Sequence, residues 1–288
     1  MSDAGTVLVT GATGNTGSWV VSGLRRRGRR ARAASRRPAP ADADAVRFDW
    51  VDARTFAPAV SGVEAVYLVA PVGVAEPMPL VGPFFQAASA AGVRRVVQLS
   101  SSAVGRGDPV LGEIHDLGAR TFDEYTALRP SWFMQNFVGD HPVADGIRRR
   151  GEIATATGHG RLGFIDAADI AAVAVEALVH PEYLGGELIL TGPESLSYPQ
   201  AAELLAEVIG EPVRHIDLHP DDLADRLAGA GYPAEYATAL AALDTRIRDG
   251  EQDFVTTTVA DITGRPPTSL REFLFRERRR LGWSPRVG

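Results

Sequence analysis

The sequence predicts an α/β fold in which a doubly wound parallel sheet of the Rossmann type is followed by a smaller, mostly helical C-terminal lobe. Two observations lead to this prediction. Short apolar runs alternate with segments of helical periodicity through the first 130 residues, and a glycine-rich turn separates the first run from the first helix. The alternation loosens after Pro130, so we expect one domain over residues 1–130 and a substrate-binding lobe over residues 131–288 packed on it.

Each element of the first domain is expected from its local pattern. Short runs rich in branched apolar residues indicate strands, and apolar residues spaced at i, i+3 and i+4 indicate helices. The expected strands are Thr6–Thr10, Ala31–Ala34, Val46–Phe48, Val63–Val69, Val93–Leu99 and Tyr125–Leu128. The expected helices are Thr16–Arg27, Pro79–Ala91 and Gly112–Phe122.

The second lobe shows mainly helical patterns, with one strand among them. The expected helices are Ser131–Val138, Ala167–Val179, Pro199–Ile209, Pro220–Gly229, Pro233–Arg248 and a last one that begins near Ser269, and the expected strand is Glu187–Leu190. We find no internal repeat and no low-complexity linker.

Composition narrows the possible functions. The chain of 288 residues is 45% hydrophobic and 23% charged, which is ordinary for a soluble globular protein, and its net charge of -6 gives no general attraction to nucleic acid or to an anionic membrane. The absence of cysteine excludes disulfides, thiolate nucleophiles and cysteine-based metal sites. We find no signal peptide and no apolar run long enough to span a membrane, so we expect a cytoplasmic protein.

The basic residues are all of one kind. Lysine is absent, so all 30 are arginines and no mechanism can use a lysine. Three arginine runs, at 25–27, 148–150 and 278–280, could suggest nucleic-acid contact, but we interpret them as solvated segments at or near helix ends, where cations complement the helix dipole. The six histidines lack the spacing of metal ligands, and we predict no metal.

The turn that follows the first strand carries glycines at 11, 14 and 17. Gly11 permits a tight turn, Gly14 lets the backbone approach a pyrophosphate, and Gly17 allows the helix to pack closely on the sheet. Free N–H groups in this turn and at the helix start would bind the phosphates. The residues expected to contact the cofactor here are Gly11, Thr13, Gly14, Asn15, Thr16 and Gly17.

The end of the second strand selects between the two nicotinamide cofactors. A protein that binds NAD usually has an acidic residue there to hold the ribose 2′-hydroxyl. This chain has Ser35 and Arg36, and no acid before Asp42. Because a guanidinium binds a phosphate bidentately whereas a carboxylate repels it, we predict NADP(H), with Arg36 as the main contact and Ser35 assisting.

Three further segments at strand ends are expected near the cofactor. Asp49 and Trp50 follow the third strand, where Asp49 could accept a hydrogen bond from the adenine amine; Trp50 could pack nearby or only close the edge of the core. Val69, Ala70 and Pro71 end the fourth strand and are expected near the nicotinamide ribose. Ser100 ends the fifth strand and is assigned to the cofactor on the same ground.

Several segments together resemble those of the NmrA-like atypical short-chain dehydrogenase/reductases, over about residues 6–275. They are the turn at 11–17, Phe48–Trp50, Ser100–Ala103, Leu128–Phe137, Phe164–Ala171 and Leu190–Glu194. Within this family the chain looks most similar to the branch of the ergot-alkaloid reductases (festuclavine and agroclavine synthases) and their bacterial relatives. The resemblance implies an NADPH-dependent reductase with a C-terminal lobe over the nicotinamide, but it leaves the substrate open.

The catalytic chemistry differs from that of most relatives in the wider superfamily. Those enzymes use a Tyr-x-x-x-Lys pair to protonate the product, and a chain without lysine cannot assemble it. Ser101 and His115 are the candidates for substrate contact and proton donation. The alternatives are that Ser101 only stabilises a turn and that His115 is a surface or supporting residue. Trp132 and Phe133 are expected to wall the substrate pocket, unless they belong to the core.

The prediction is therefore an NADPH-dependent reductase, active in secondary metabolism, that transfers a hydride to a small organic acceptor. An iminium or a quinone best fits a site without the Tyr-Lys pair, because neither needs an enzymatic proton in the hydride step. An activated alkene or carbonyl remains a possible acceptor. The alternative is a regulatory protein that senses NADP(H) without catalysis. An epimerase or dehydratase is disfavoured, since those enzymes also rely on the Tyr-Lys pair.

Overall fold

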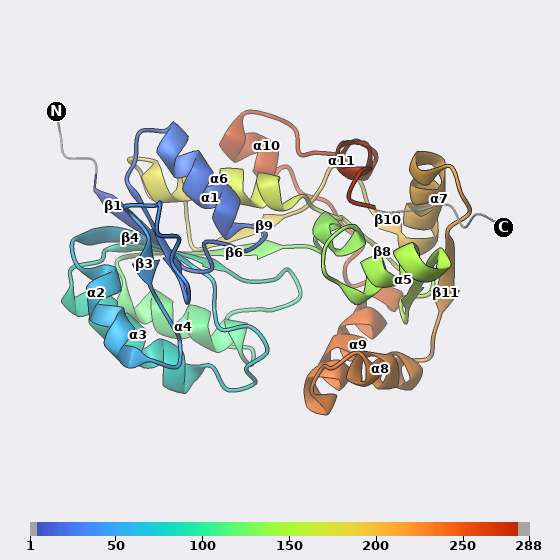
Figure 1. The fold of residues 1–288 in the computed structure, drawn as a ribbon, viewed down its shortest axis with the longest axis horizontal. Coiled ribbons are helices and arrows are strands. Elements are labelled where there is room, and N and C mark those ends of the chain that lie inside the picture. Colours follow the sequence, from blue (N-terminus) through green and yellow to red (C-terminus); the bar gives the residue numbers. More distant parts are fainter. Residues whose placement is uncertain (1–4, 282–288) are drawn as a thin grey trace. The chain divides into compact units, whose positions relative to one another are not determined.

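The structure, a computed structural model, describes residues 5–281, and these form two compact units (Figure 1). Within the described residues, unit 1 consists of residues 5–130, Ala167–Leu190 and Thr258–Arg265. Unit 2 consists of Ser131–Asp166, Thr191–Thr257 and residues 266–281. The expected division at residue 130 marks only the first change of unit, because two later segments of the chain return to unit 1.

Unit 1 is built on a seven-stranded parallel sheet with the strand order β3-β2-β1-β4-β5-β6-β9. The strands are β1 (Thr6–Val9), β2 (Ala31–Ser35), β3 (Val46–Arg47), β4 (Val63–Leu68), β5 (Arg95–Leu99), β6 (Glu124–Pro130) and β9 (Glu187–Leu190). The order reverses at β1, and the carboxyl ends of β1 and β4 flank this switch point, which is where doubly wound sheets bind ligands. The predicted fold class is confirmed.

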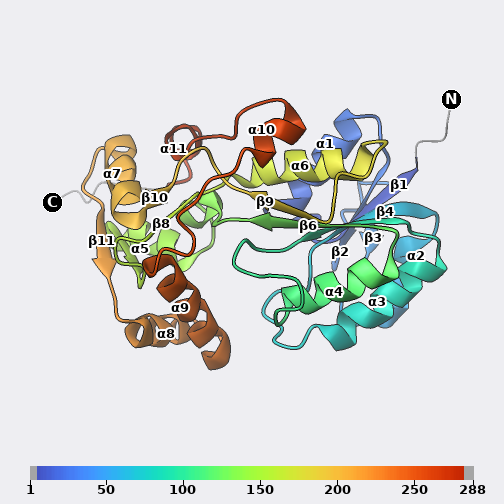
Figure 2. The same ribbon diagram turned by 180° about the vertical axis from the view of Figure 1, so that it is seen from behind.

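Helices cover both faces of this sheet, as a fully parallel sheet requires. One face carries α1 (Gly17–Arg26), α6 (Ala167–Val179) and α10 (Thr258–Thr263), and the other carries α2 (Phe56–Val60), α3 (Met78–Ala90) and α4 (Leu111–Thr121) (Figures 1 and 2). The predicted bounds of α6 and β9 are confirmed. Both lie in segments that return to unit 1. There β9 pairs with β6, and α6 packs against α1 on the same face of the sheet.

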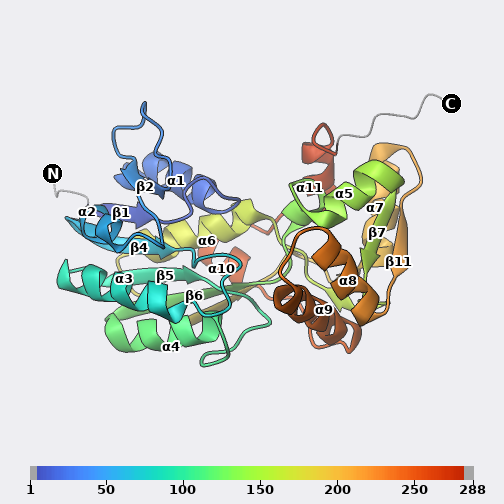
Figure 3. The same cartoon turned by 60° about the horizontal axis from the view of Figure 1, so that its bottom comes forward.

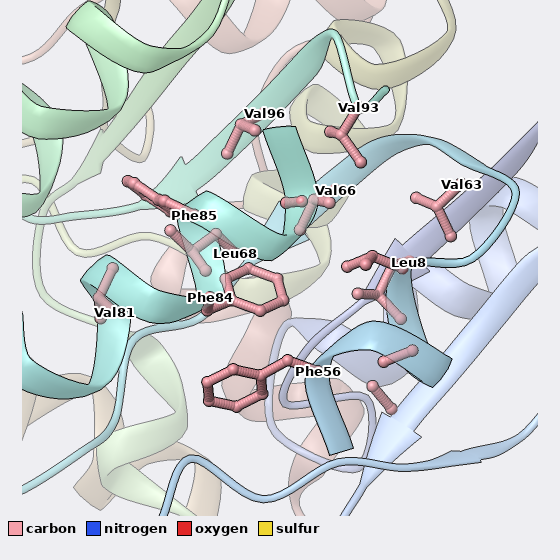
Figure 4. Close-up of a cluster of buried hydrophobic side chains, with 14 of the residues drawn as sticks. Leu8, Phe56, Val63, Val66, Leu68, Val81, Phe84, Phe85, Val93 and Val96 are labelled. Atoms are coloured by element: carbon pink, nitrogen blue, oxygen red, sulfur yellow. The ribbon is translucent and has the colours of Figure 1, made fainter. Parts of the chain in front are cut away.

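An aromatic cluster fills the layer between the sheet and α2, α3 and α4 (Figure 4). Phe84 of α3 lies at its centre, with its ring centroid 5.4 Å from that of Phe48 and 5.6 Å from that of Phe56, both edge to face. Leu8 of β1 and Val66 of β4 supply the sheet side of the cluster. The ends of β1 and β4 therefore rest on a rigid core.

Unit 2 is mostly helical but also contains two small sheets that the sequence did not predict. β7 (Glu152–Thr155) pairs in parallel with β11 (Arg214–Asp217), and β8 (Arg161–Leu162) pairs antiparallel with β10 (Leu196–Ser197). The helices are α5 (Pro142–Arg150), α7 (Tyr198–Ile209), α8 (Pro220–Gly229), α9 (Ala234–Arg248) and α11 (Leu270–Glu277), and Figure 3 shows α8 beside α9. None of the helices within residues 5–281 is long and apolar enough to cross a membrane.

The predicted helix over Ser131–Val138 is wrong. Only a short 3-10 turn forms there, at Met134–Phe137. The residues before it are extended, because the peptide groups around Ile165 hold them: Ile165 N donates to Trp132 O at 2.9 Å, and Met134 N donates to Ile165 O at 2.9 Å. A parallel bridge to a segment about thirty residues later thus overrides the local helical periodicity.

Two of the three arginine runs lie at helix ends, as predicted. Arg25 and Arg26 occupy the last turn of α1, and the run at 148–150 occupies the last turn of α5. The run at 278–280 follows α11.

One half-buried carboxyl group, that of Asp244, holds a loop of unit 2 in place. Asp244 on α9 accepts a hydrogen bond from the N–H of Ala156, just after β7, at 2.9 Å. Burial raises the pKa of Asp244 to about 6, against the lowering effects of this hydrogen bond and of the Arg248 charge. The folded protein therefore binds a proton at this site at pH values where the unfolded chain does not.

The stability of the protein should therefore depend on pH through Asp244. Between about pH 4 and pH 6 the folded state holds more protons at Asp244 than the unfolded state, so this residue's contribution to the free energy of unfolding falls as the pH rises. We expect Asp244→Asn to remove that fall, because the amide oxygen still accepts from Ala156 without ionising. Urea unfolding of both proteins from pH 4.5 to 7.5 measures the difference, and parallel pH profiles would contradict the assignment.

Candidate functional site

The glycine turn between β1 and α1 folds back on its own backbone. Gly11 has a φ of +60°, which favours glycine, and Gly14 N donates to Gly11 O at 2.9 Å. A β-carbon at Gly17 would lie 2.2 Å from Gly11 O, so only glycine fits at the start of α1. A β-carbon at Gly14 would meet only Gly11 O, at 3.2 Å, and otherwise open space. The turn is therefore closed on the helix side and open at Gly14.

The N–H groups of this turn are available for an anion. Within residues 5–281, the backbone N–H groups of Thr13, Asn15 and Thr16 have no hydrogen-bond partner. The first residue before α1, Thr16, caps no N–H with its side chain, and the first turn of α1 contains no acidic residue. An uncapped helix start next to a glycine cradle fits a pyrophosphate, so these residues suit a dinucleotide cofactor.

Side chains from the sheet fix the position of the turn. The buried Tyr67 on β4 donates its hydroxyl proton to Thr16 Oγ1 at 2.9 Å. The hydroxyl of Thr10 accepts from Val69 N at 2.7 Å and so ties the end of β1 to the end of β4. Neither Thr10 nor Tyr67 was predicted as a site residue, since both lie within strand patterns that only their partners distinguish from ordinary core.

Val69, Ala70 and Pro71 follow β4 directly. A β-carbon at Gly11 would lie 3.1 to 3.3 Å from the side chain of Val69, so the turn and this segment lie side by side at the switch point. Their contact with a nicotinamide ribose stays a prediction.

The end of β2 presents two arginines that have no partner. Arg36 and Arg37 are exposed and form no ion pair or hydrogen bond within the described part of the chain, and Ser35 before them is half-buried. The next carboxylate in the sequence, Asp42, is bound by Arg25 at 2.7 and 2.8 Å, and this guanidinium holds the pKa of Asp42 below its usual range. The first acid after β2 in the sequence is thus engaged by Arg25.

The segment after β3 has a clear role in packing. The ring of Trp50 lies 4.9 Å from that of Phe48 and 5.3 Å from that of Phe84, both edge to face, so it closes the edge of the aromatic cluster. Asp49 accepts from Val51 N at 3.3 Å. This geometry is the one expected if Trp50 closes the core, and the adenine contact of Asp49 and Trp50 stays a prediction.

The serines after β5 lie at the carboxyl edge of the sheet. Ser100 is buried and its N–H donates to Leu128 O at 2.7 Å, while Ser102 N donates to Pro130 O at 2.9 Å. Ser101 lies between them, half-buried, and its Oγ accepts from Ala103 N at 3.2 Å. The loop is therefore an ordered continuation of the sheet.

His115 lies on α4 and is buried, which excludes the alternative that it is a surface residue. Its ring stacks on that of Tyr125, with centroids 5.7 Å apart and planes 14° apart, and its Nδ1 lies 3.6 Å from Glu187 Oε1. Burial lowers the pKa of His115 more than the nearby Glu187 raises it. The imidazole is therefore mainly neutral at neutral pH and is a poor proton donor there.

Trp132 and Phe133 belong to unit 2 and are both half-buried. Trp132 packs against the hydrophobic core of unit 2, and Phe133 forms the bridge to Ile165. Their contact with a substrate stays a prediction. The described residues contain no cluster of three or more His, Asp or Glu side chains that could hold a metal ion.

A parallel doubly wound sheet with an uncapped helix start in a glycine cradle defines a Rossmann-type protein suited to a dinucleotide. One family model, described as NAD(P)H-binding, matches residues 11–181, and a second, for the NmrA-like family, matches residues 110–274. The chain belongs to the NmrA-like family of NAD(P)H-binding proteins.

Named relatives span nearly the whole chain. An uncharacterized oxidoreductase of Bacillus subtilis, YesF, is 46% identical over 269 residues, which are 93% of each chain. The agroclavine dehydrogenase of Claviceps fusiformis is 37% identical over 93% of this chain and 96% of its own. Among solved structures, the NADPH-dependent quinone oxidoreductase QOR2 of Escherichia coli, complexed with NADPH, superposes with a TM-score of 0.80 at 26% identity and covers 94% of this chain and 99% of its own. The predicted family and enzyme class are confirmed.

A single methyl group at the open side of the glycine turn tests the cradle. Gly14→Ala requires Gly11 O to shift by only a few tenths of an ångström, but its methyl group lies where the pyrophosphate is proposed to approach. We expect the affinity for NADPH to fall about tenfold or more, equivalent to about 1.4 kcal/mol, in calorimetric titration. The melting temperature should stay near that of the unaltered protein, and tight binding by this variant would contradict the assigned cradle.

Proposed function

We propose that the chain is an NADPH-dependent reductase that transfers a hydride to a small organic acceptor, preferably an iminium or a quinone. The observation that carries the cofactor choice is the unpartnered pair Arg36 and Arg37 at the end of β2, with Asp42 already bound to Arg25. A free guanidinium suits a ribose 2′-phosphate, whereas the first carboxylate after β2 in the sequence, which could select a 2′-hydroxyl, is already paired.

The choice of acceptor follows from the shortage of proton donors in unit 1. Its three tyrosine hydroxyls all donate to protein acceptors: Tyr67 to Thr16 Oγ1, Tyr125 to Gln98 Oε1 and Tyr183 to the carbonyl of Tyr125. Burial raises the pKa of Tyr67 and of Tyr125, and it lowers the pKa of His115. An acceptor that needs an enzymatic proton during hydride transfer is therefore poorly served.

An iminium or a quinone avoids this difficulty. Hydride addition turns an iminium into a neutral amine without a proton, and it turns a quinone into a stabilised hydroquinone anion that water can protonate. The bound dinucleotide supplies the hydride. The chain then needs only to hold the pyrophosphate at the glycine turn, the 2′-phosphate at Arg36 and the acceptor in line with the hydride, where the Ser101 hydroxyl can donate a hydrogen bond.

The names of relatives agree with acceptors of this kind. They include the agroclavine dehydrogenase and the quinone oxidoreductase described above, and an NAD(P)H azoreductase of Xenophilus azovorans that is 32% identical over 93% of this chain. A protein that only senses NADP(H) would bind the same dinucleotide but reduce none of these acceptor classes.

Cofactor preference can be tested at Arg36. We expect Arg36→Ser to raise the dissociation constant for NADPH about tenfold or more and to leave that for NADH nearly unchanged, because only NADPH carries the 2′-phosphate. Calorimetric titration with both dinucleotides measures this. Arg37→Ser is the matched control, since Arg37 is equally exposed and unpaired, and an equal loss in both variants would contradict the assignment of Arg36 as the main contact.

Acceptor class can be tested by following NADPH absorbance at 340 nm with a cyclic iminium, a quinone and a simple ketone of similar size. We expect the first two to be reduced and the ketone to be left unreduced. His115→Ala should leave the rates on iminium and quinone within about threefold at pH 7.5, because no enzymatic proton is needed. A loss of more than about tenfold would make His115 the donor, and no turnover at all would favour a sensor.

A further inference from the structure

The side chain of Arg129 is bound at three points next to the serine loop. It lies at the end of β6, with only 16% of the side chain exposed. Its Nε donates to Ser101 O at 3.3 Å, its Nη2 to Ser102 O at 3.0 Å and its Nη1 to Glu187 Oε2 at 2.6 Å. One guanidinium thus connects two consecutive carbonyls of the loop to the first residue of β9.

These bonds leave one group of Ser101 unassigned. Its carbonyl is held by Arg129 Nε and its Oγ accepts from Ala103 N, so the residue is fixed at both ends. Within residues 5–281 the hydroxyl proton of Ser101 has no acceptor. A fixed hydroxyl with a spare proton is a directed hydrogen-bond donor.

Glu187 lies between the cationic Arg129 and the ionisable His115. One carboxylate oxygen accepts from Arg129, and the other lies 3.6 Å from His115 Nδ1. His115 in turn stacks on Tyr125, whose hydroxyl donates to Gln98 on β5 at 2.8 Å. The contacts therefore run from the serine loop through Arg129 and Glu187 to the buried face of α4.

We propose that Arg129, oriented by Glu187, is a positioning residue that fixes the Ser101 hydroxyl as a hydrogen-bond donor to the acceptor or to the nicotinamide carboxamide. This inference rests on the proposed function, because it places Ser101 where the hydride is transferred. The planar fork of arginine matches the geometry, since a lysine ammonium could not serve the same three acceptors in one plane.

A second buried arginine of unit 1 provides a matched control at the other end of the sheet. Arg95 begins β5, its side chain is 13% exposed, and it forms an ion pair with Glu124. It also donates to three carbonyls, those of Ala177, Leu178 and His180. Its surroundings match those of Arg129 in burial, charge and bonding, but they lie at the amino end of the strands, away from the predicted site.

Kinetics of single and double variants separate positioning from general stability. We expect Arg129→Lys to lower kcat about tenfold or more while the dissociation constant for NADPH stays within about twofold. Ser101→Ala should lower kcat to a similar extent. If Arg129 acts through Ser101, the double variant loses no more than the worse single one, whereas independent roles would multiply the losses. Arg95→Met should keep kcat within about twofold despite a comparable loss of stability.

A second measurement needs no turnover: the titration of His115 followed by NMR, with His115→Gln identifying its signal. The charged groups that act on His115 are Glu187, Asp116, Arg106 and Arg129. Glu187→Gln removes a carboxylate that raises the pKa of His115, so this pKa should fall further. Arg129→Met removes a cation and should raise it, while Arg129→Lys and Arg95→Met should leave it nearly unchanged.

The outcomes distinguish this inference from the proposed function. Equal losses of kcat in Arg129→Lys and Arg95→Met, or multiplying losses in the double variant, would overturn the positioning role. If the unaltered protein reduces no acceptor, the proposed function fails, and the NMR titration then decides whether Arg129 and Glu187 form the coupled pair. A His115 pKa that moves in neither variant would overturn the pair as well.

Discussion

The close approach of the α1 start to the carbonyl of Gly11 is the constraint on which the site depends. Because no side chain fits at Gly17, the helix begins directly against the turn, and the N–H groups of Thr13, Asn15 and Thr16 just before it are left without a partner in the described chain. A backbone with free donors at a helix start suits an anion at that place. Tyr67 and Thr10 then tie this arrangement to β4, so that the turn and the strand ends hold one another in register.

Much of unit 1 could be predicted because its signals are local. The glycine spacing and the alternation of strands and helices depend on neighbours in sequence, and the predicted bounds of α6 and β9 match the structure, as do those of α8 in unit 2. The helix predicted over Ser131–Val138 failed because a distant residue, Ile165, holds that segment extended. The two small sheets of unit 2 were missed for a similar reason, since their strands are short and find their partners far along the chain.

The candidate site shows the same contrast. The residues proposed to meet a cofactor through the backbone or a free charge, such as Gly14 and Arg36, can be identified from the sequence. The supporting contacts are not, because Arg129 and Glu187 are 58 positions apart and neither has a motif that indicates its partner. The segment Leu128–Phe137 did contribute to the family resemblance, and this was the one signal that could have drawn attention to Arg129.

The interleaving of the two units has a consequence for how such a protein can change over time. α6 and β9, which complete unit 1, are encoded after the first stretch of unit 2, and α10, a further helix of unit 1, comes later still. A fragment that stopped at residue 130 would expose an open sheet edge at β6 and the bare side of α1. Recombination therefore cannot exchange the second unit as one continuous cassette.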